Sequence, residues 1–301
     1  VGVPGSAKSR FAGLECAVVG DVDERFAVDP DSDLFAVELQ LDTRIIDKAV
    51  KWDFGVNLSV NRSKVLSLSD GKDIFGSTVS NTIISDQLNL MRIGEPMYVF
   101  YGYVEEGYDD NGQLVYKDLD GSDGITPADK TIIGNPNPDC LLSFNTAVSY
   151  KGFTLSAFFQ GSIGNDIYSL SMASAAYDYN SNANTLREVL YNHWTPEKPD
   201  AKYPNLRQDI ALKMSDRFVY DGSYMRLKNL ELSYNIPCSK SRVISKARVY
   251  VSAQNLWTIT SYPFWDPDVN AKGGSTSLAQ GIDASCYPGA RTFTLGCRLV
   301  F

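Results

Sequence analysis

The segment from Asp118 to Asp129 brings together side chains that could bind a metal ion. Its twelve residues place carboxylates at positions 1, 3 and 12 and a hydroxyl at position 5, namely Asp118, Asp120, Asp129 and Ser122. Oxygen ligands at alternate positions around a tight turn suit a hard cation such as Ca²⁺, as in an EF-hand loop. Position 6 is Asp123 instead of glycine, and position 12 is Asp instead of Glu. The segment is therefore a candidate calcium site, and an aspartate-rich turn without metal is the alternative.

Aromatic side chains form a second candidate group. They lie in the long segments between predicted strands, and the residues singled out for substrate binding are Tyr177, Tyr179, Trp194 and Trp265. Such rings could stack on the sugar rings of a glycan. Packing of the rings against one another within these segments is the alternative interpretation.

Other catalytic and binding classes find little support in the sequence. His193 is the single histidine, and no P-loop, nucleophile elbow or His-Glu-x-x-His motif is present. The five cysteines are scattered without zinc spacing. We expect no enzymatic activity, no catalytic residues and no cofactor apart from the candidate calcium. The net charge of -8 argues against nucleic acid as a partner.

The last eleven residues, Arg291 to Phe301, predict an amphipathic strand. Apolar residues alternate with Thr, Gly and Arg, and Val300 is the one exception. At about 3.3 Å per residue and a tilt near 45°, such a strand crosses roughly one bilayer core. The residues interpreted as an assembly signal of an outer-membrane barrel are Phe293, Leu295, Leu299 and Phe301.

The same period of two recurs along the chain and predicts further strands. The alternating segments are 37–45, 52–60, 142–150, 153–159, 230–236 and 249–253. Their polar positions are rich in Asn, Ser, Thr, Gln and Gly, with scattered charges. This composition favours a wet barrel lumen over bulk water.

The connections between these strands alternate in length. Residues 47–51, 151–152 and 237–245 are short, whereas 63–139, 161–222 and 259–290 are long. Short turns on one side and long loops on the other are typical of outer-membrane barrels. We therefore predict an all-β fold, a partial transmembrane antiparallel up-and-down β-barrel of about eight strands with long extracellular loops.

Three further expectations concern single segments. Residues 184–194 predict a helix in one long loop, with an apolar stripe from Leu186 to Trp194. Residues 1–35 form a poorly legible N-terminal segment, in which 10–19 could be one strand. No stretch approaches 18 apolar residues, so no transmembrane helix is expected.

Several motifs together resemble the C-terminal part of SusC/RagA-type TonB-dependent outer-membrane transporters. They are Lys51-Trp-Asp-Phe-Gly-Val-Asn-Leu-Ser-Val-Asn-Arg-Ser-Lys-Val-Leu66, Tyr116-Lys-Asp-Leu-Asp-Gly121, Thr131-Ile-Ile-Gly-Asn-Pro-Asn-Pro-Asp139, Phe159-Gln-Gly-Ser-Ile-Gly-Asn-Asp-Ile-Tyr168, Gly222-Ser-Tyr-Met-Arg-Leu-Lys-Asn-Leu230, Val249-Tyr-Val-Ser-Ala-Gln-Asn-Leu256 and the final strand. They occur in the family's order across about residues 36–301. The acidic segment departs from the family's Asp-x-Asn-Gly-Asp-Gly pattern, which weakens any inherited cation site.

The resemblance implies a fold and partners beyond the residues present. It implies a 22-stranded barrel with a plug, of which residues 36–301 would be the C-terminal portion, with the plug domain absent. It further implies the outer membrane of a Gram-negative bacterium, contact with its lipid, and import of an oligosaccharide or peptide. The implied partners are a SusD-like lipoprotein and the TonB system, the latter through an N-terminal part. The alternative is a soluble or surface-exposed β-rich glycan-binding module without transport.

Overall fold

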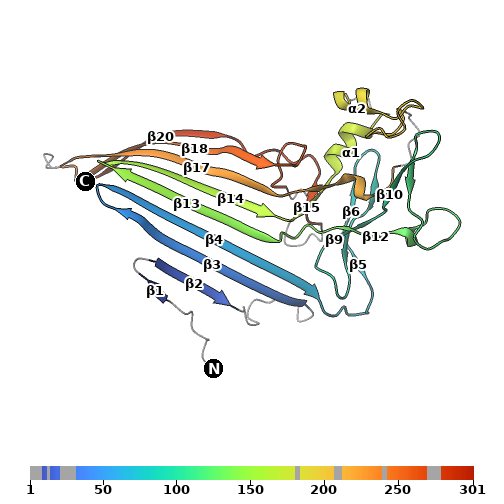
Figure 1. The fold of residues 1–301 in the computed structure, drawn as a ribbon, viewed down its shortest axis with the longest axis horizontal. Helices are drawn as coiled ribbons and strands as arrows, with labels where there is room; N and C mark the ends of the chain where they lie inside the picture. The colour runs from blue at the N-terminus through green and yellow to red at the C-terminus, as the bar shows by residue number, and fades with distance from the viewer. Residues whose placement is uncertain are drawn as a thin grey trace.

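The computed structural model describes residues 9–11, 14–20, 32–179, 184–206, 212–238, 243–269 and 279–301, with side chains from residue 35 onward. Long strands run side by side across most of the molecule, and shorter elements gather at one end (Figure 1). We call the long sheet the wall. We call the described parts of residues 66–139, 164–223 and 261–291 the head.

The wall is one nine-stranded sheet with the order β1-β2-β3-β4-β13-β14-β17-β18-β20. Every neighbouring pair is antiparallel. The strands are β1 (Ser9–Phe11), β2 (Leu14–Gly20), β3 (Ser32–Asp47), β4 (Val50–Val65), β13 (Cys140–Tyr150), β14 (Phe153–Ile163), β17 (Tyr224–Ile236), β18 (Lys246–Thr260) and β20 (Thr292–Val300). The predicted antiparallel, up-and-down β fold is confirmed.

The N-terminal part of the wall differs from the expectation of one strand over 10–19. The chain instead forms two strands, β1 and β2, paired as a hairpin with Phe11 opposite Leu14. This adds a ninth strand to the eight expected. β3 then begins at Ser32, earlier than the alternation at 37–45 indicated.

The register separates apolar from polar side chains across the wall. One row of directly opposed residues runs Trp52, Val148, Leu155, Leu232, Val251 and Leu295. The row on the opposite side of the sheet runs Asp53, Ala147, Ser156, Glu231, Ser252 and Thr294. Because successive side chains of a strand alternate between faces, the wall has an apolar face and a polar face.

The apolar face is open to the surroundings instead of being packed into a core. Leu155, Leu232 and Val251 are about half exposed, and Leu295 is 83% exposed. Local contacts do order the face: Phe144 stacks on Phe159 with ring centroids 4.3 Å apart. Trp52, Phe144 and Phe293 all lie on this face, and no dry centre gathers them.

The wall strands are joined by short turns at one end and by the head at the other (Figure 1). Lys151 and Gly152 alone connect β13 to β14, and both adopt positive φ, 47° and 88°. A glycine relieves the strain of that conformation in a two-residue hairpin turn. The predicted alternation of short and long connections is therefore confirmed.

The head contains four small sheets and the helices. Its strands are β5 (Ile74–Phe75), β6 (Thr78–Ser80), β7 (Ser85–Gln87), β8 (Asn89–Met91), β9 (Val99–Gly102), β10 (Glu105–Tyr108), β11 (Leu114–Tyr116), β12 (Thr131–Gly134), β15 (Asp166–Ser169), β16 (Val219–Asp221) and β19 (Ile282–Asp283). Its helices are α1 (Leu170–Tyr177) and α2 (Arg187–Asn192), with 3-10 turns η1 (Pro127–Asp129) and η2 (Asp216–Phe218). No helix in the described ranges is long and apolar enough to cross a membrane.

The two helices differ from the sequence expectation. α2 is shorter than the predicted 184–194, because Leu186 lies at its N-terminus in an extended conformation and His193 ends it. Val189 is buried as predicted, whereas Leu190 points to solvent. α1 was not predicted, since its apolar residues are mixed with the serines Ser171 and Ser174 and do not form one stripe, and most of the helix is buried in the head.

The hydrophobic core lies in the head. The largest fully buried side chains are Tyr168, Tyr203, Phe100, Phe218, Leu88, Leu90, Ile167, Leu170, Met214, Ile282, Val79 and Val99. Every one of them comes from the head. Tyr168 packs edge-on against both Phe100 and Phe218, with ring centroids 6.0 and 6.1 Å apart. The head is therefore a packed unit, and the wall is a two-sided sheet without a core of its own.

Candidate functional site

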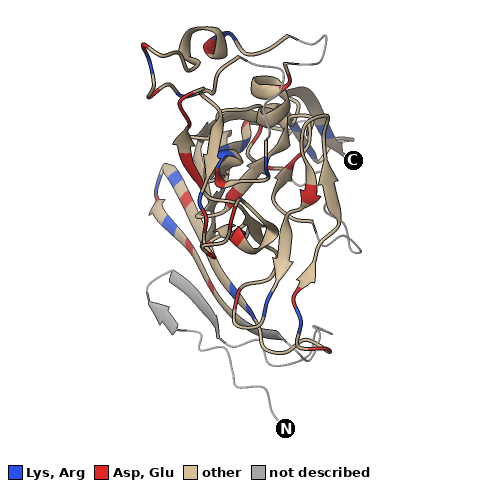
Figure 2. Ribbon diagram, turned by 90° about the vertical axis from the view of Figure 1, so that its right-hand side faces the viewer, with Lys and Arg blue, Asp and Glu red and all other residues tan. Residues whose placement is uncertain are grey.

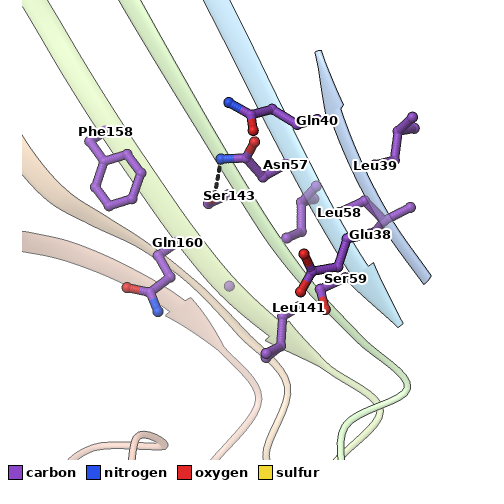
Figure 3. Close-up of a pocket in the computed structure, with 12 residues that line it drawn as sticks. Glu38, Leu39, Gln40, Asn57, Leu58, Ser59, Leu141, Ser143, Phe158 and Gln160 are labelled. Carbon is purple, nitrogen blue, oxygen red and sulfur yellow. Dashed lines mark hydrogen bonds between the residues drawn. The ribbon is translucent and has the colours of Figure 1, made fainter. Parts of the chain in front are cut away.

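The polar face of the wall carries a hollow of about 370 Å³ that spans β3, β4, β13 and β14. Polar and apolar residues line it in equal number, and the close-up shows how the polar side chains project from neighbouring strands (Figure 3). The polar lining residues are Glu38, Gln40, Asn57, Ser59, Ser143 and Gln160. Leu141 and Phe158 supply apolar surface on the same face.

Neighbouring strands partly satisfy the polar groups of this hollow. Asn57 Nδ2 donates to Ser143 Oγ at 3.4 Å, and Gln40 Nε2 donates to Asp42 Oδ2 at 2.8 Å. Further along the same strands, Arg44 Nε donates to Asp53 Oδ1 at 2.6 Å. Acidic and basic residues are thus interspersed along β3 and β4 (Figure 2). The surface suits neutral hydrogen-bonding groups more than a ligand of one charge sign.

A second hollow of about 370 Å³ lies in the head. Its lining residues are Glu105, Tyr177, Lys202, Tyr203, Asp216, Arg217 and Tyr220. Arg217 is its central group: it forms a two-pronged ion pair with Glu105 and donates to the hydroxyls of Tyr177 at 2.9 Å and Tyr108 at 3.0 Å.

The charged groups around this second hollow are paired with other residues of the head. Burial opposes the charged form of Arg217, but the bonds to Glu105 outweigh it and raise the pKa of Arg217. Burial raises the pKa of the Tyr177 hydroxyl well above its usual range, although Arg217 pulls the other way. Lys202 is paired with Glu188 at 3.0 Å. A ligand would therefore meet tyrosine rings and hydroxyls with few unpaired charges.

The structure does not bring the four predicted substrate-binding aromatics together. Only Tyr177 lines the head hollow, and it is 6% exposed. Tyr179 is half-buried, and burial raises its pKa to about 12. Trp194 is buried against Gly112, where a Cβ would lie 2.5 Å from its ring. Trp265 is 61% exposed and stacks on Phe264 with centroids 4.9 Å apart.

Sequence reasoning missed most residues of the head hollow. Glu105 and Arg217 are more than a hundred positions apart in the chain, and no local motif links them. Two signals were available: Tyr203 and Tyr220 are further aromatics of the same long segment. They lacked a spacing pattern that would distinguish them from packing residues.

The acidic segment brings three of the four candidate calcium ligands close together. One carboxylate oxygen from each of Asp118, Asp120 and Asp129 lies within 4.8 Å of the others. The fourth candidate, Ser122, instead hydrogen-bonds within the turn, its hydroxyl donating to the carbonyl oxygen of Gly124 at 3.4 Å. These three carboxylates are the residues that could hold a cation.

Asp129 also has a structural role in this segment. It is fully buried and accepts backbone N–H bonds from Leu119 at 2.7 Å, Asp120 at 3.3 Å and Thr126 at 2.7 Å. The Thr126 bond is the main reason that the pKa of Asp129 lies below its usual value. The alternative of a hydrogen-bonded turn therefore has direct structural support.

The C-terminal strand is placed as predicted for a wall strand. Phe293, Leu295 and Leu299 lie on the apolar face of β20, opposite Ala253, Val251 and Ala247 of β18. Phe301 follows the end of the strand and is exposed. The lone histidine, His193, contacts the carbonyl oxygens of Val189 and Leu190 at the end of α2.

The wall defines a class of protein. A single antiparallel sheet of long strands with one exposed apolar face, one polar face and all short turns at one end is a section of an outer-membrane-type β-barrel. The barrel is not closed by the strands described.

Comparisons with known proteins agree with this class. TonB-dependent receptor P3 of Formosa agariphila is 33% identical over 88% of this chain, and the chain covers 28% of that receptor. TonB-dependent receptor SusC of Bacteroides thetaiotaomicron is 28% identical over 89% of this chain and 26% of its own length. No family model matches the chain. The chain is a homologue of part of the TonB-dependent receptors, SusC among them, which confirms the resemblance drawn from its sequence.

Solved structures support the fold. The structure of the RagAB peptide transporter matches 89% of this chain with a TM-score of 0.70 at 23% identity, and the chain covers 29% of that structure. The open-open state of the RagAB peptide importer matches 96% of the chain with a TM-score of 0.69. The chain therefore spans less than a third of the length of the receptors it resembles.

Proposed function

We propose that this chain forms part of the barrel wall and the extracellular head of a TonB-energised importer. The importer would lie in the outer membrane of a Gram-negative bacterium. Residues 36–301 would form most of the barrel portion, and the described wall residues before them, in β1, β2 and the start of β3, would continue the same sheet. The observation that carries this proposal is the continuous register of the wall, which leaves large apolar side chains exposed on one face and polar side chains on the other.

Physical argument favours lipid over water beside the apolar face. Soluble proteins rarely expose contiguous apolar patches of more than a few hundred Å², whereas a barrel in a bilayer places such residues against hydrocarbon. The alternative of a soluble glycan-binding module would require another layer to cover this face. The homology to TonB-dependent receptors supports the same choice.

The substrate and partners are further parts of the proposal. We propose a large nutrient, an oligosaccharide or a peptide, carried past the polar face, and a SusD-like lipoprotein contacting the head. Homology to SusC and structural likeness to a peptide transporter support these classes. TonB would act through a segment N-terminal to these residues. The four aromatics Tyr177, Tyr179, Trp194 and Trp265 remain proposed contacts, and Trp265 is the most accessible.

Adjacent residues of β20 allow a matched test of membrane insertion. Leu295 and Thr294 are both exposed and lie on opposite faces at the same depth. Leu295→Arg would place a charge in hydrocarbon, at a cost of about 2 to 4 kcal/mol near the midplane. Thr294→Arg would place it in the lumen. We expect only Leu295→Arg to reduce incorporation of the chain into lipid vesicles, measured by flotation. Equal incorporation of both variants would contradict the proposal.

We also propose Ca²⁺ at Asp118, Asp120 and Asp129, which the proximity of their carboxylates supports. Isothermal titration with CaCl₂ tests it, with Asp118→Asn as the variant and Asp109→Asn in the neighbouring turn as the control. Asp109 already accepts the backbone N–H groups of Asn111 and Gln113. Binding lost only in Asp118→Asn is expected. No binding by the unmodified chain would leave the hydrogen-bonded turn as the correct interpretation.

A further inference from the structure

β20 lies at an edge of the wall and pairs on one side only. Its nine residues bond with β18, and no other described strand contacts its second side. Every second N–H and C=O group of an edge strand faces away from its neighbour. In hydrocarbon each unpaired backbone group costs several kcal/mol. If the wall spans a membrane, as proposed above, this edge needs another strand.

The polar face of β20 shows what that strand should carry. Arg298 of β20 lies directly opposite Arg248 of β18. Like charges directly opposite each other destabilise a sheet. Arg248 turns away from this contact: its Nη2 donates to Glu231 and, at 2.9 Å, to Ser233 Oγ. The one carboxylate of this region is therefore used by Arg248.

Arg298 has no comparable partner within the wall. It is exposed, and no ion pair or side-chain hydrogen bond joins it to any residue of the described ranges. Lys246 precedes Arg248 by two residues on β18, so it lies on the same face and adds positive charge. Three cations thus face one carboxylate, and the free edge of β20 is the side from which compensation can come.

We propose that the free edge of β20 pairs with an antiparallel strand that carries Glu or Asp on its polar face opposite Arg298. Its other face would carry apolar residues that continue the row of Leu295. A second copy of this chain does not fit, because β20 contains no Asp or Glu and would bring further arginines to the edge. The relatives are more than three times as long as their match to this chain, so they have ample sequence for such a strand.

Synthetic peptides of about ten residues, the length of a transmembrane strand, test the proposal. The peptides alternate Thr and Val and differ only at the third residue, a polar position that lies opposite Arg298 when the peptide spans β20 from Val300 backwards; this residue is Glu, Gln or Lys. Each is labelled and titrated with the full 301-residue chain refolded in detergent micelles, and binding is followed by fluorescence anisotropy. We expect the Glu peptide to bind about 1.5- to 5-fold more tightly than the Gln peptide, the range of a cross-strand ion pair. The Lys peptide should bind most weakly.

The variant Arg298→Glu should reverse this order and favour the Lys peptide. Equal binding of the three peptides to the unmodified chain would overturn the proposed charge pairing while leaving the membrane wall intact. Binding of none of them, or self-association of the chain through β20 in preference to peptide, would also overturn it. The comparison on the unmodified chain decides the question even if Arg298→Glu fails to fold.

Discussion

Arg226 joins the wall to the last long connection of the head, residues 261–291, through an ion pair. Its side chain is almost fully buried on the polar face of β17 and forms an ion pair with Asp266. Asp266 also accepts the backbone N–H groups of Asp268 at 2.9 Å and Gly289 at 3.1 Å. The carboxylate of Asp266 thus bonds to backbone near the start and near the end of this connection. It is also the main counter-charge of the buried Arg226.

We expect Asp266→Asn to destabilise this attachment by about 3 kcal/mol, because it leaves a buried arginine without its partner. Asp268→Asn is the matched control. Asp268 lies 3.9 Å from Arg226 but is half exposed, so its loss should cost less than about 1 kcal/mol. Hydrogen exchange of residues 261–269 and 282–291 measures both. Equal effects of the two variants would show that Asp266 is not the anchor.

The same contact predicts a pH dependence. Burial alone would raise the pKa of Asp266, but the bonds from Arg226 and from two backbone N–H groups outweigh it and lower the pKa. A carboxyl with a lowered folded pKa stabilises the fold above its unfolded pKa, and this stabilisation is lost as pH falls through the folded value. The protection factors of this segment, which are the exchange rates corrected for the intrinsic effect of pH, should be constant from pH 7 to 5. It should accelerate below about pH 4 in the unmodified chain but not in Asp266→Asn.

At the scale of elements, glycine and tyrosine interlock where β18 meets β20. Tyr250 and Gly296 are directly opposite on the polar face. The tyrosine ring lies over the glycine so closely that a Cβ there would be 2.4 Å from Tyr250 Cζ. An aromatic that covers a glycine on a neighbouring strand helps to fix the register of the pair.

We expect Gly296→Val to destabilise the β18–β20 pair by about 1 to 3 kcal/mol, because the new side chain displaces the ring. In a Tyr250→Ala background the same substitution should cost nothing or stabilise, since Val suits a strand better than Gly. Thr294→Val, on the same face of β20, is the control. Guanidinium unfolding in detergent micelles measures the four variants. Additive effects of Gly296→Val and Tyr250→Ala would rule out the interlock.

The wall strands could be predicted because alternation is a local property of the sequence. For β13 the predicted range 142–150 lies within two residues of the observed ends, whereas for β4 the predicted range 52–60 stops five residues before the strand ends at Val65. In β17 the prediction began only at Leu230, because an extra residue at Lys228 shifts the register between Leu227 and Asn229. Leu227 and Leu230 then share a face despite their odd spacing. A bulge of this kind has no signature in one sequence.

The head could not be predicted in the same way. Its strands are mostly two to four residues long, as in β5 and β19, which is too short for a period to be read. Their residues are buried by partners distant in the chain: Tyr168 pairs with Ile282 across a parallel bridge of β15 and β19. The head hollow depends on the same contacts, so its arginine–glutamate centre was also missed.

The molecule as a whole joins two parts that are stabilised differently. The wall buries little apolar surface among the residues described, and in our proposal it depends on lipid and on neighbouring strands. The head holds its own core, assembled from all three long connections, as Phe100, Tyr168 and Ile282 illustrate. Contacts of such long sequence separation form slowly in folding. The head core therefore needs all three connections at the same end of the molecule, which is where the wall strands place them.

This division predicts that a core substitution in the head leaves the wall intact. Phe218 is 0% exposed and lies edge-on to Tyr177 at a centroid distance of 5.3 Å. Phe218→Ala should cost the head about 3 to 5 kcal/mol, the usual penalty for emptying a buried aromatic site. Phe153→Ala, on the apolar face of β14 and 53% exposed, is the control.

Hydrogen exchange of the chain in lipid vesicles should then show protection lost in residues 89–102 and 166–177 for Phe218→Ala, and retained there for Phe153→Ala. Because the wall is held by its own ladder of backbone bonds, β13, β14, β17 and β18 should keep their protection in Phe218→Ala. Loss of protection in those strands as well would mean that head and wall unfold as one cooperative unit.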